Sequence, residues 1–410
     1  MRKWAIGAGV VVLAAAIIVG VFLFTQDEEE EPLPPPSTVK VAVAFPLDLE
    51  IGQDYLNAVQ MALDAAGGKA SRTTVELLVL NTSDPDPESA RGTADQEAAA
   101  AAEAAADPAV VLYIGMSNSG QAQAAIPILN EAGIASISGQ ATWPGLTKAG
   151  FGEGEPGTYY PSGERTFFRV VPSDDIQGVA AARWIARLGF RRVYIVDDGS
   201  VYGAGIAGIL EASAQENNLQ VIGHVQFDPE TATAETFGDL AEEIVATQPD
   251  IVYIGGSVSE GGGALLGALR TADSAIQIMG ADGLIQASIF AENEPGLLEG
   301  VYATSVSIPA TVLGIEAARI FQQDFQAAHS KDPLPHVINS YETMQVALHA
   351  IAQAGNTPTR ANVLEAMRNL GTFSGVLGSW QFDANGDITA APISGWRVQD
   401  DEWTFALVVQ

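Results

Sequence analysis

The chain has 410 residues, with 50 Asp and Glu against 19 Lys and Arg, no cysteine and a formal net charge of −31. The lack of cysteine excludes disulfides, thiolate metal sites, a cysteine nucleophile and a lipid-modified N-terminal cysteine. So acidic a chain excludes a basic nucleic-acid surface, and its charge favours a solvated surface over an acidic site for a partner.

The first segment is apolar and long enough to cross a membrane. Residues 4–24 carry no charged side chain, and at about 1.5 Å per residue a helix of this length spans roughly 31 Å. Arg2 and Lys3 precede it, which predicts that the rest of the chain lies outside the cytoplasm. We expect an uncleaved single-pass anchor in the cell membrane, then an acidic, proline-rich linker at 25–37. A cleaved signal, leaving a secreted or periplasmic protein, is the alternative.

From residue 38 the chain alternates β-rich runs with helical stretches. In a first series we expect strands at 39–45, 75–80, 110–114 and 134–137 and helices at 54–66, 90–106 and 121–131. In a second series we expect strands at 167–171, 193–196, 221–227, 251–254 and 276–279 and helices at 176–188, 203–216, 237–247 and 265–271. This alternation predicts parallel sheets built from βαβ units, and the number of strands favours two α/β lobes.

The last part of the chain has a different pattern. Helices are expected at 314–329, 340–354 and 362–369, followed by short antiparallel strands at 380–382, 396–398 and 404–409. The acidic run 383–387 is similar to a calcium loop, but its glycine is two places early and the glutamate at position twelve is missing. Asn385-Gly386 is therefore interpreted as a hairpin turn.

Motifs of catalysis are weak in this sequence. Residues 203–208 form a GxGxxG, but six residues separate it from the preceding strand, which argues against a dinucleotide site. The four histidines form no metal-ligand pair, and His329 and His336 are expected to be solvated. Without a nucleophile elbow, P-loop or acid–base pair, we expect a protein that is not an enzyme and needs no cofactor or metal.

Three positions at strand ends are candidates for binding on local grounds. Ser119 and Gly120 open a helix after a strand, where free N–H groups and a hydroxyl suit a carboxylate; the alternative is that Ser117 or Ser119 only caps the helix. Tyr202 follows a strand end, where a tyrosine can stack on a ligand or donate to it; the alternative is that it only packs at the start of a helix. Asp282 also follows a strand, and the alternative for it is that it caps a helix beginning at Leu284.

Taken in order, several segments resemble the type I periplasmic binding proteins of ABC importers, in the branch that binds leucine, isoleucine and valine. The matching runs include 115–119, 137–147, 175–178, 196–203, 280–283 and 377–383. The resemblance covers nearly all of 38–410 and implies two doubly wound parallel-sheet lobes joined by three crossovers. Lobe one would hold 38–171 plus 305–373, and lobe two 172–304 plus 374–410.

The resemblance also implies a ligand cleft between the lobes. Ser119 falls at the carboxylate contact, and Gln140 and Thr142 fall on the turn that meets the ligand's ammonium. Tyr202 matches the aromatic residue that closes over the ligand, and Asp282 matches an acidic position that is usually glutamate. Ser257 stands where the family has a second aromatic residue, and the Gln140 side chain replaces a smaller one. The changes at Asp282 and Ser257 enlarge the predicted pocket.

The function implied is that of an extracytoplasmic solute-binding protein. It would bind a branched-chain or related amino acid by hinge closure and deliver it to an ABC permease in the membrane. We expect a monomer without cofactors. The alternatives are a ligand-sensing ectodomain, which a following signalling domain would support, and a binder of amides or urea on the same fold.

Overall fold

The computed structural model describes residues 37–86 and 91–409. The expected anchor at 4–24 and all but the last residue of the linker at 25–37 lie outside this part of the chain. Within the described residues, no helix has both the length and the apolar character that a membrane span requires.

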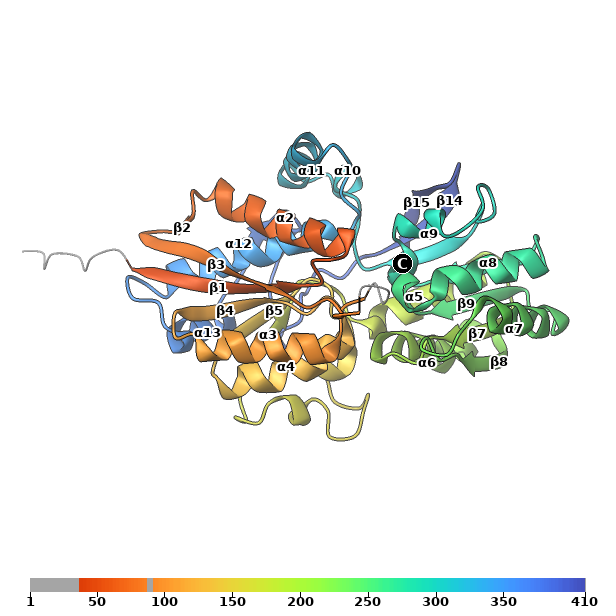
Figure 1. Ribbon diagram of the computed structural model, residues 1–410, viewed down its shortest axis with the longest axis horizontal. Helices are drawn as coiled ribbons and strands as arrows, with labels where there is room; N and C mark the ends of the chain where they lie inside the picture. Colours follow the sequence, from red (N-terminus) through yellow and green to blue (C-terminus); the bar gives the residue numbers. More distant parts are fainter. Residues whose placement is uncertain (1–36, 87–90, 410) are drawn as a thin grey trace, which may run out of the picture. The chain divides into compact units, whose positions relative to one another are not determined.

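The first lobe is built on a six-stranded sheet of order β2-β3-β1-β4-β5-β6. Its strands are β1 (Thr38–Phe45), β2 (Lys69–Ala70), β3 (Thr73–Asn81), β4 (Val110–Gly115), β5 (Ala135–Ser138) and β6 (Phe167–Arg169). All of their pairings are parallel except that of the short edge strand β2. One face carries α2 (Glu50–Ala65), α12 (Val337–Gln353) and α13 (Arg360–Arg368), and the other carries α3 (Ala94–Ala106) and α4 (Ser119–Glu131) (Figure 1).

The second lobe is built on a seven-stranded sheet of order β15-β14-β11-β10-β9-β7-β8. Its strands are β7 (Arg192–Asp197), β8 (Gln220–Gln226), β9 (Ile251–Gly255), β10 (Ile278–Gly280), β11 (Tyr302–Ser305), β14 (Ile393–Gln399) and β15 (Glu402–Val409). Helices α5 (Asp174–Arg187) and α6 (Val201–Ala214) cover one face, and α7 (Ala234–Ala246) and α8 (Gly262–Ala272) the other. The predicted class of two α/β lobes is confirmed, but both sheets are mixed, since β14 and β15 pair antiparallel at the second sheet's edge.

The chain passes between the two sheets three times. It leaves the first sheet after β6 and the second after β11, and it then forms α10 (Ala310–Leu313), α11 (Glu316–His329), α12 and α13. The hairpin of β12 (Phe373–Gly375) and β13 (Gly378–Trp380) follows. Trp380 and Ile388 both pack in the core of the first lobe, so the last crossing comes after Ile388, later than the predicted boundary at 373/374.

The pattern of β1 shows why this strand lies in the centre of its lobe. Val41 and Val43 face the core under α2 and α12, whereas Ala42 and Ala44 face the core under α3 and α4, and all four are at most 1% exposed. A parallel strand covered by helices on both faces has this continuously apolar pattern. The small residues on the second face let the alanine-rich α3 pack closely, with three alanines buried.

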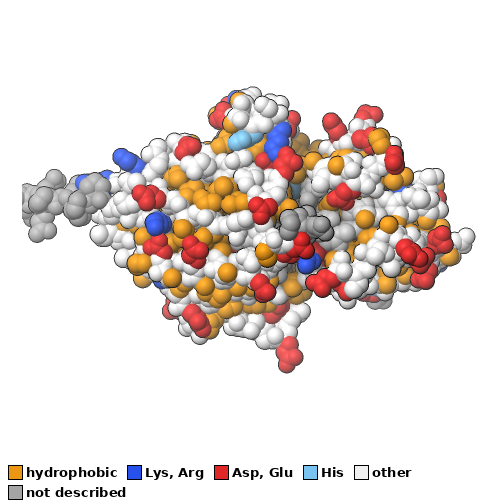
Figure 2. Space-filling model, in the orientation of Figure 1, with side chains coloured by type: hydrophobic (Ala, Val, Ile, Leu, Met, Phe, Trp, Pro, Cys, Tyr) orange, Lys and Arg blue, Asp and Glu red, His pale blue; other side chains and the backbone are white. Residues whose placement is uncertain are grey.

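Acidic side chains are spread over the face of the molecule seen in Figure 2, with few basic side chains between them. On this face the acidic side chains lie over both lobes, and spread charges of this kind increase solubility.

Candidate functional site

A cleft of about 700 Å³ lies between the two lobes, at the carboxyl ends of parallel strands from both sheets. Six of the seven predicted ligand residues line it, namely Ser119, Gly120, Gln140, Tyr202, Ser257 and Asp282. Thr142 does not line it and is 1% exposed. The structure therefore brings residues that are far apart in sequence to one cleft.

The start of α4 forms one wall of the cleft. Its N-cap is Asn118, whose Oδ1 accepts a hydrogen bond from the Gln121 N–H at 2.8 Å, so the alternative that Ser117 or Ser119 caps the helix is wrong. Ser119 Oγ accepts from the Trp143 N–H at 3.1 Å and keeps its own proton for another acceptor. The N–H groups of Ser119 and Gly120 have no acceptor within the described chain, as the first N–H groups of a helix must.

The turn after β5 brings Gln140 to the cleft. Ser138 Oγ donates to the Met116 carbonyl and accepts from the N–H groups of Gln140 and Ala141, which joins this turn to the loop before α4. The Gln140 side chain donates to Ser340 Oγ at 2.8 Å, so it is held by α12 of the same lobe. The Thr142 hydroxyl is buried without a hydrogen-bond partner in the described residues.

On the opposite wall, a short helical turn begins at Asp282. Its Oδ1 accepts from Gln177 Nε2 at 2.7 Å and from the Tyr202 hydroxyl at 2.8 Å. The Tyr202 oxygen in turn accepts from the Gly283 N–H. Asp282 therefore does not act as a helix cap, and Tyr202 is bonded to the acidic side chain rather than merely packed.

Asp174 was not predicted as a site residue, yet it lies close behind Asp282. It opens α5 at the first crossing and is 0% exposed; neither carboxylate oxygen makes a hydrogen bond of normal geometry in the described chain, although the Thr142 hydroxyl lies close enough to lower its pKa. Burial raises the pKa of Asp174 well above its usual value, and the charge of Asp282 adds to the rise. Burial also raises the pKa of Asp282, and its bonds to Gln177 and Tyr202 only partly offset this. Within the described residues neither carboxyl group has an ion-pair partner, and Asp282 is only partly buried and faces the cleft, so a cationic group there would stabilise its charge.

The glycines of the GxGxxG motif have a packing role. The motif lies inside α6, and a Cβ at Gly205 would fall 2.5 Å from the Trp143 ring of the other lobe. A Cβ at Gly203 would fall 2.6 Å from the Gly255 carbonyl oxygen. Close approach between elements therefore explains these glycines without a dinucleotide.

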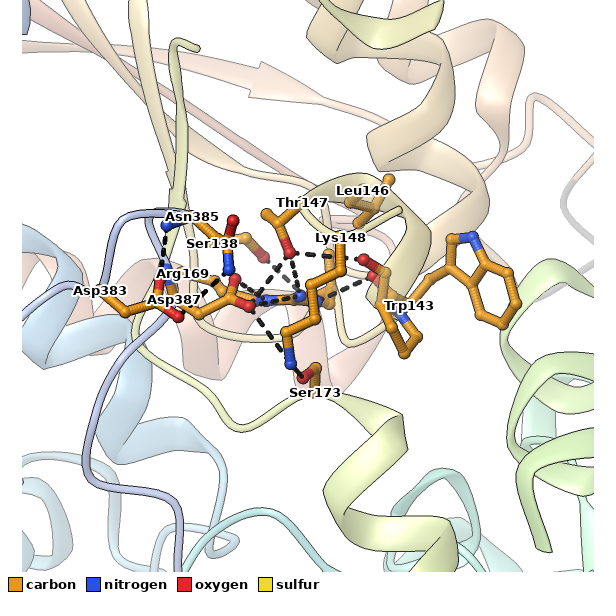
Figure 3. A network of polar contacts seen from close by, with 12 residues as sticks. Ser138, Trp143, Leu146, Thr147, Lys148, Arg169, Ser173, Asp383, Asn385 and Asp387 are labelled. Atoms are coloured by element: carbon orange, nitrogen blue, oxygen red, sulfur yellow. Dashed lines mark hydrogen bonds and ion pairs between the residues drawn. The ribbon is translucent and has the colours of Figure 1, made fainter. Parts of the chain in front are cut away.

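The acidic run 383–387 takes part in a network at the crossings (Figure 3). Gly386 has φ +81° and its N–H bonds the Asp383 carbonyl, as expected for a turn, and residues 382 and 388 pair antiparallel. Arg169, which is 0% exposed, donates through Nε to Asp387 at 2.7 Å. Burial alone would raise the pKa of Asp387, but Arg169 and Lys148 bring it below its usual value. The carboxylates of this acidic run are therefore bonded to other residues of the protein.

Among the described residues, two cations of the first lobe, Lys148 and Arg91, form ion pairs with the second lobe. Lys148 pairs with Asp175 of α5 at 2.8 Å, beside the first crossing. At the cleft, Arg91 of the first lobe pairs with Glu260 at 3.3 Å and Glu230 at 3.6 Å, both of the second lobe.

Comparisons with known proteins identify the family of this chain. Residues 46–402 match the family described as periplasmic binding protein, so the chain belongs to that family. It is 26% identical over 347 residues, 84% of this chain and 87% of the relative, to the Leu/Ile/Val-binding protein BraC3 of Rhizobium johnstonii. The resemblance to the branched-chain branch of ABC-transporter binding proteins is thereby confirmed, as is the prediction that the chain is not an enzyme.

Solved structures share the fold. A leucine-binding protein, LivK, from Thermotoga maritima has a TM-score of 0.78 at 23% identity, covering 91% of this chain and 99% of that one. A solute-binding protein from R. palustris, solved with benzoate, has a TM-score of 0.75 at 16% identity, covering 91% and 96%. The fold therefore occurs with chemically different ligands.

The polar cleft or near-cleft residues that the sequence reasoning missed include Asp174, Tyr55 and His336. Asp174 had a signal, since an acidic residue opens the helix directly after a crossing. His336 was expected to be solvated, but it is 8% exposed and lines the cleft, where its ring packs against Tyr55 of α2.

Proposed function

We propose that this protein is the solute-binding component of an ABC importer and that it binds an α-amino acid in the cleft. One observation carries the proposal: free N–H groups at the start of α4 face the same cleft as the acidic Asp282. A helix N-terminus attracts an anion, and an acidic side chain attracts a cation. The two together complement the carboxylate and the ammonium of a zwitterion.

The proposed roles follow from these contacts. The N–H groups of Ser119 and Gly120, with the Ser119 hydroxyl, hold the carboxylate. The Gln140 carbonyl and Asp282 hold the ammonium. Thr142 has no place in this set, because it is buried outside the lining of the cleft. Bonds from Gln177 and Tyr202 fix the Asp282 side chain before the ligand arrives, which reduces the reorganisation that binding requires.

Binding is proposed to close the lobes about the crossings. Three crossing segments connect the lobes. A ligand that touches both walls of the cleft makes more contacts in the closed form and therefore stabilises it. Tyr202 then covers the ligand, and Ser257 leaves space where the family has an aromatic residue. The permease would recognise the closed form, by analogy with the family.

The relatives named for leucine, isoleucine and valine support an amino acid of that kind or a related one. We propose that the protein acts as a monomer outside the cytoplasm, held at the membrane by residues 4–24. A sensory role and an amide or urea ligand remain as alternatives on the same fold.

The test is ligand-dependent thermal unfolding. The full chain in mild detergent, stripped of carried-over ligand by reversible unfolding, is heated with single amino acids, simple amides, urea and benzoate. A micromolar ligand at about 1 mM adds roughly 4 kcal/mol to the free energy of unfolding, which shifts the midpoint by several degrees. A shift with an amino acid supports the proposal. A shift only with benzoate, or with none of these compounds, would overturn it.

A further inference from the structure

Two polar side chains of the first lobe line the cleft beside the proposed amino-acid site. Tyr55 lies on α2 and is 6% exposed, and His336 directly precedes α12 and is 8% exposed. Their rings meet edge to face, with centroids 5.8 Å apart. We call this pair the polar corner.

Neither side chain of the polar corner has a hydrogen bond to any residue that the structure describes. Elsewhere in this lobe, buried tyrosine hydroxyls do have acceptors: Tyr113 donates to Glu97 at 2.6 Å, and Tyr160 donates to the Leu146 carbonyl at 2.7 Å. The polar atoms of the corner are not sealed inside the lobe but are open to the cleft, so they are available to the polar atoms of a ligand there.

Both groups of the polar corner are neutral at physiological pH. Burial lowers the pKa of His336 to about 4, so its ring offers one donor and one acceptor. Burial raises the pKa of the Tyr55 hydroxyl, and the charges of Asp282 and Asp54 add to the rise, so its proton is retained. Tyr55 and Asp282 line the same cleft.

The charges around the polar corner disfavour an anion. Asp54 and Glu50 lie on the same helix, line the cleft, and share a single cation, Lys331. The three groups together carry a negative charge, which repels an acidic side chain. A neutral group that both donates and accepts hydrogen bonds is not repelled by this charge.

We infer that the polar corner takes a carboxamide on the side chain of the solute, so that the ligand class is asparagine or glutamine rather than leucine, isoleucine or valine. The Tyr55 hydroxyl donates to the amide oxygen, and the unprotonated nitrogen of His336 accepts from the amide N–H. This inference rests on the proposed function, because it requires an amino acid bound by Ser119 and Asp282. It is specific to this chain, since it depends on the unpaired groups of Tyr55 and His336.

Asparagine and leucine give a direct test, because their side chains have nearly the same shape and differ in polarity. Isothermal titration of the full, stripped chain in detergent should show asparagine or glutamine binding at least about tenfold more tightly than leucine. Tyr55→Phe removes only the hydroxyl and should lower the affinity for the amide about tenfold, without lowering that for leucine. Tyr341→Phe, a half-buried tyrosine outside the cleft, is the matched control and should change neither.

His336 is tested by a pair of variants. His336→Leu should weaken amide binding by a similar factor, and His336→Gln, which can still accept a hydrogen bond, should restore part of it. If His336→Leu loses affinity for the amide-bearing amino acid and for leucine alike, and His336→Gln does not restore it, His336 has a purely structural role. That result would overturn its part in the inference.

The outcomes separate this inference from the proposed function. Leucine binding as tightly as the amides, with Tyr55→Phe unchanged, would overturn the polar corner but leave amino-acid binding intact. Binding of no amino acid at all would overturn both.

Discussion

Asp387 and Asp282 are two shielded carboxyl groups that the protein treats in opposite ways. Asp387 lies at the crossings against Arg169 and Lys148, and these cations lower its pKa. Asp282 lies in the cleft against Gln177 and Tyr202; none of the described Lys or Arg side chains acts on it, and burial raises its pKa. Under the proposed function, Asp387 is an acid already paired within the fold, whereas Asp282 has only neutral donors from the protein and is available for a cation of the ligand.

The largest effect should come from breaking the pair at the crossings. Asp387→Ala leaves the fully buried Arg169 without its counter-charge, and removing one partner of a buried pair costs about 3–5 kcal/mol. Urea unfolding should show this loss in the free energy of unfolding. Asp239→Ala, at an exposed position on α7, is the matched control and should cost almost nothing. Equal stability of the two variants would show that the Arg169 network does not hold the lobes.

Substitution of Asp282 in the cleft should have the opposite effects, with a large loss of ligand affinity and no loss of stability. Asp282→Asn keeps the shape but removes the charge, and loss of a desolvated charge partner weakens binding by about 2–5 kcal/mol, roughly 30-fold to over 1,000-fold. The empty protein should be as stable as the wild type or more so, because a charge without a counter-ion is removed. Titration calorimetry and thermal unfolding of the same sample measure both. Lower stability with unchanged ligand affinity would show that Asp282, like Asp387, serves the stability of the fold and not binding.

Raised pKa values set the pH dependence of the empty protein. Burial raises the pKa of Asp198 to about 6 and that of Glu342 to about 7. A carboxyl group whose pKa rises on folding favours the folded state while protonated, and this stability is lost as the pH rises from its unfolded value through its folded value. Asp387 acts oppositely and loses its contribution only as the pH falls below its usual 3.8. His336 acts against this trend below about pH 6.5, because burial lowers its pKa to about 4, but Glu97, whose pKa burial raises to about 7, adds to the trend. Unfolding midpoints should therefore be higher at about pH 5 than at about pH 8, at constant salt. A midpoint that rises over this interval would contradict the assignment.

The smallest effect should come from the ion pairs at the cleft. Arg91 is partly solvated and pairs with Glu230 and Glu260 across the lobes. Exposed pairs contribute about 0–1 kcal/mol and are screened by salt. Arg91→Met should therefore reduce ligand affinity by less than about tenfold at low salt and by less still at high salt. A loss as large as that of Asp282→Asn would place Arg91 in the ligand site.

Much of the fold could be predicted from the sequence, because periodicity is strong in long elements such as α2 and β1. The strand β11 was missed, although it carries the second crossing. It has only four residues between irregular segments, and its place in the sheet is set by β10 and β14, which are distant in sequence or very short.

The site could be predicted only in part. Resemblance located Ser119 and Asp282 because they stand in matching runs of sequence. Tyr55 and His336 carry no local signal: a tyrosine within an amphipathic helix is indistinguishable from a core residue, and only the fold brings it beside a histidine that is far away in the chain.

The central claim is that Asp282 awaits the ammonium group of an amino acid. It is tested most directly by comparing the tightest-binding amino acid with its analogue lacking only the amino group, in the wild type and in Asp282→Asn. The account predicts that the wild type discriminates between the two by about 100-fold and that the variant loses most of this discrimination. Equal affinity of the wild type for both compounds would show that the cleft binds a simple acid and would contradict the account.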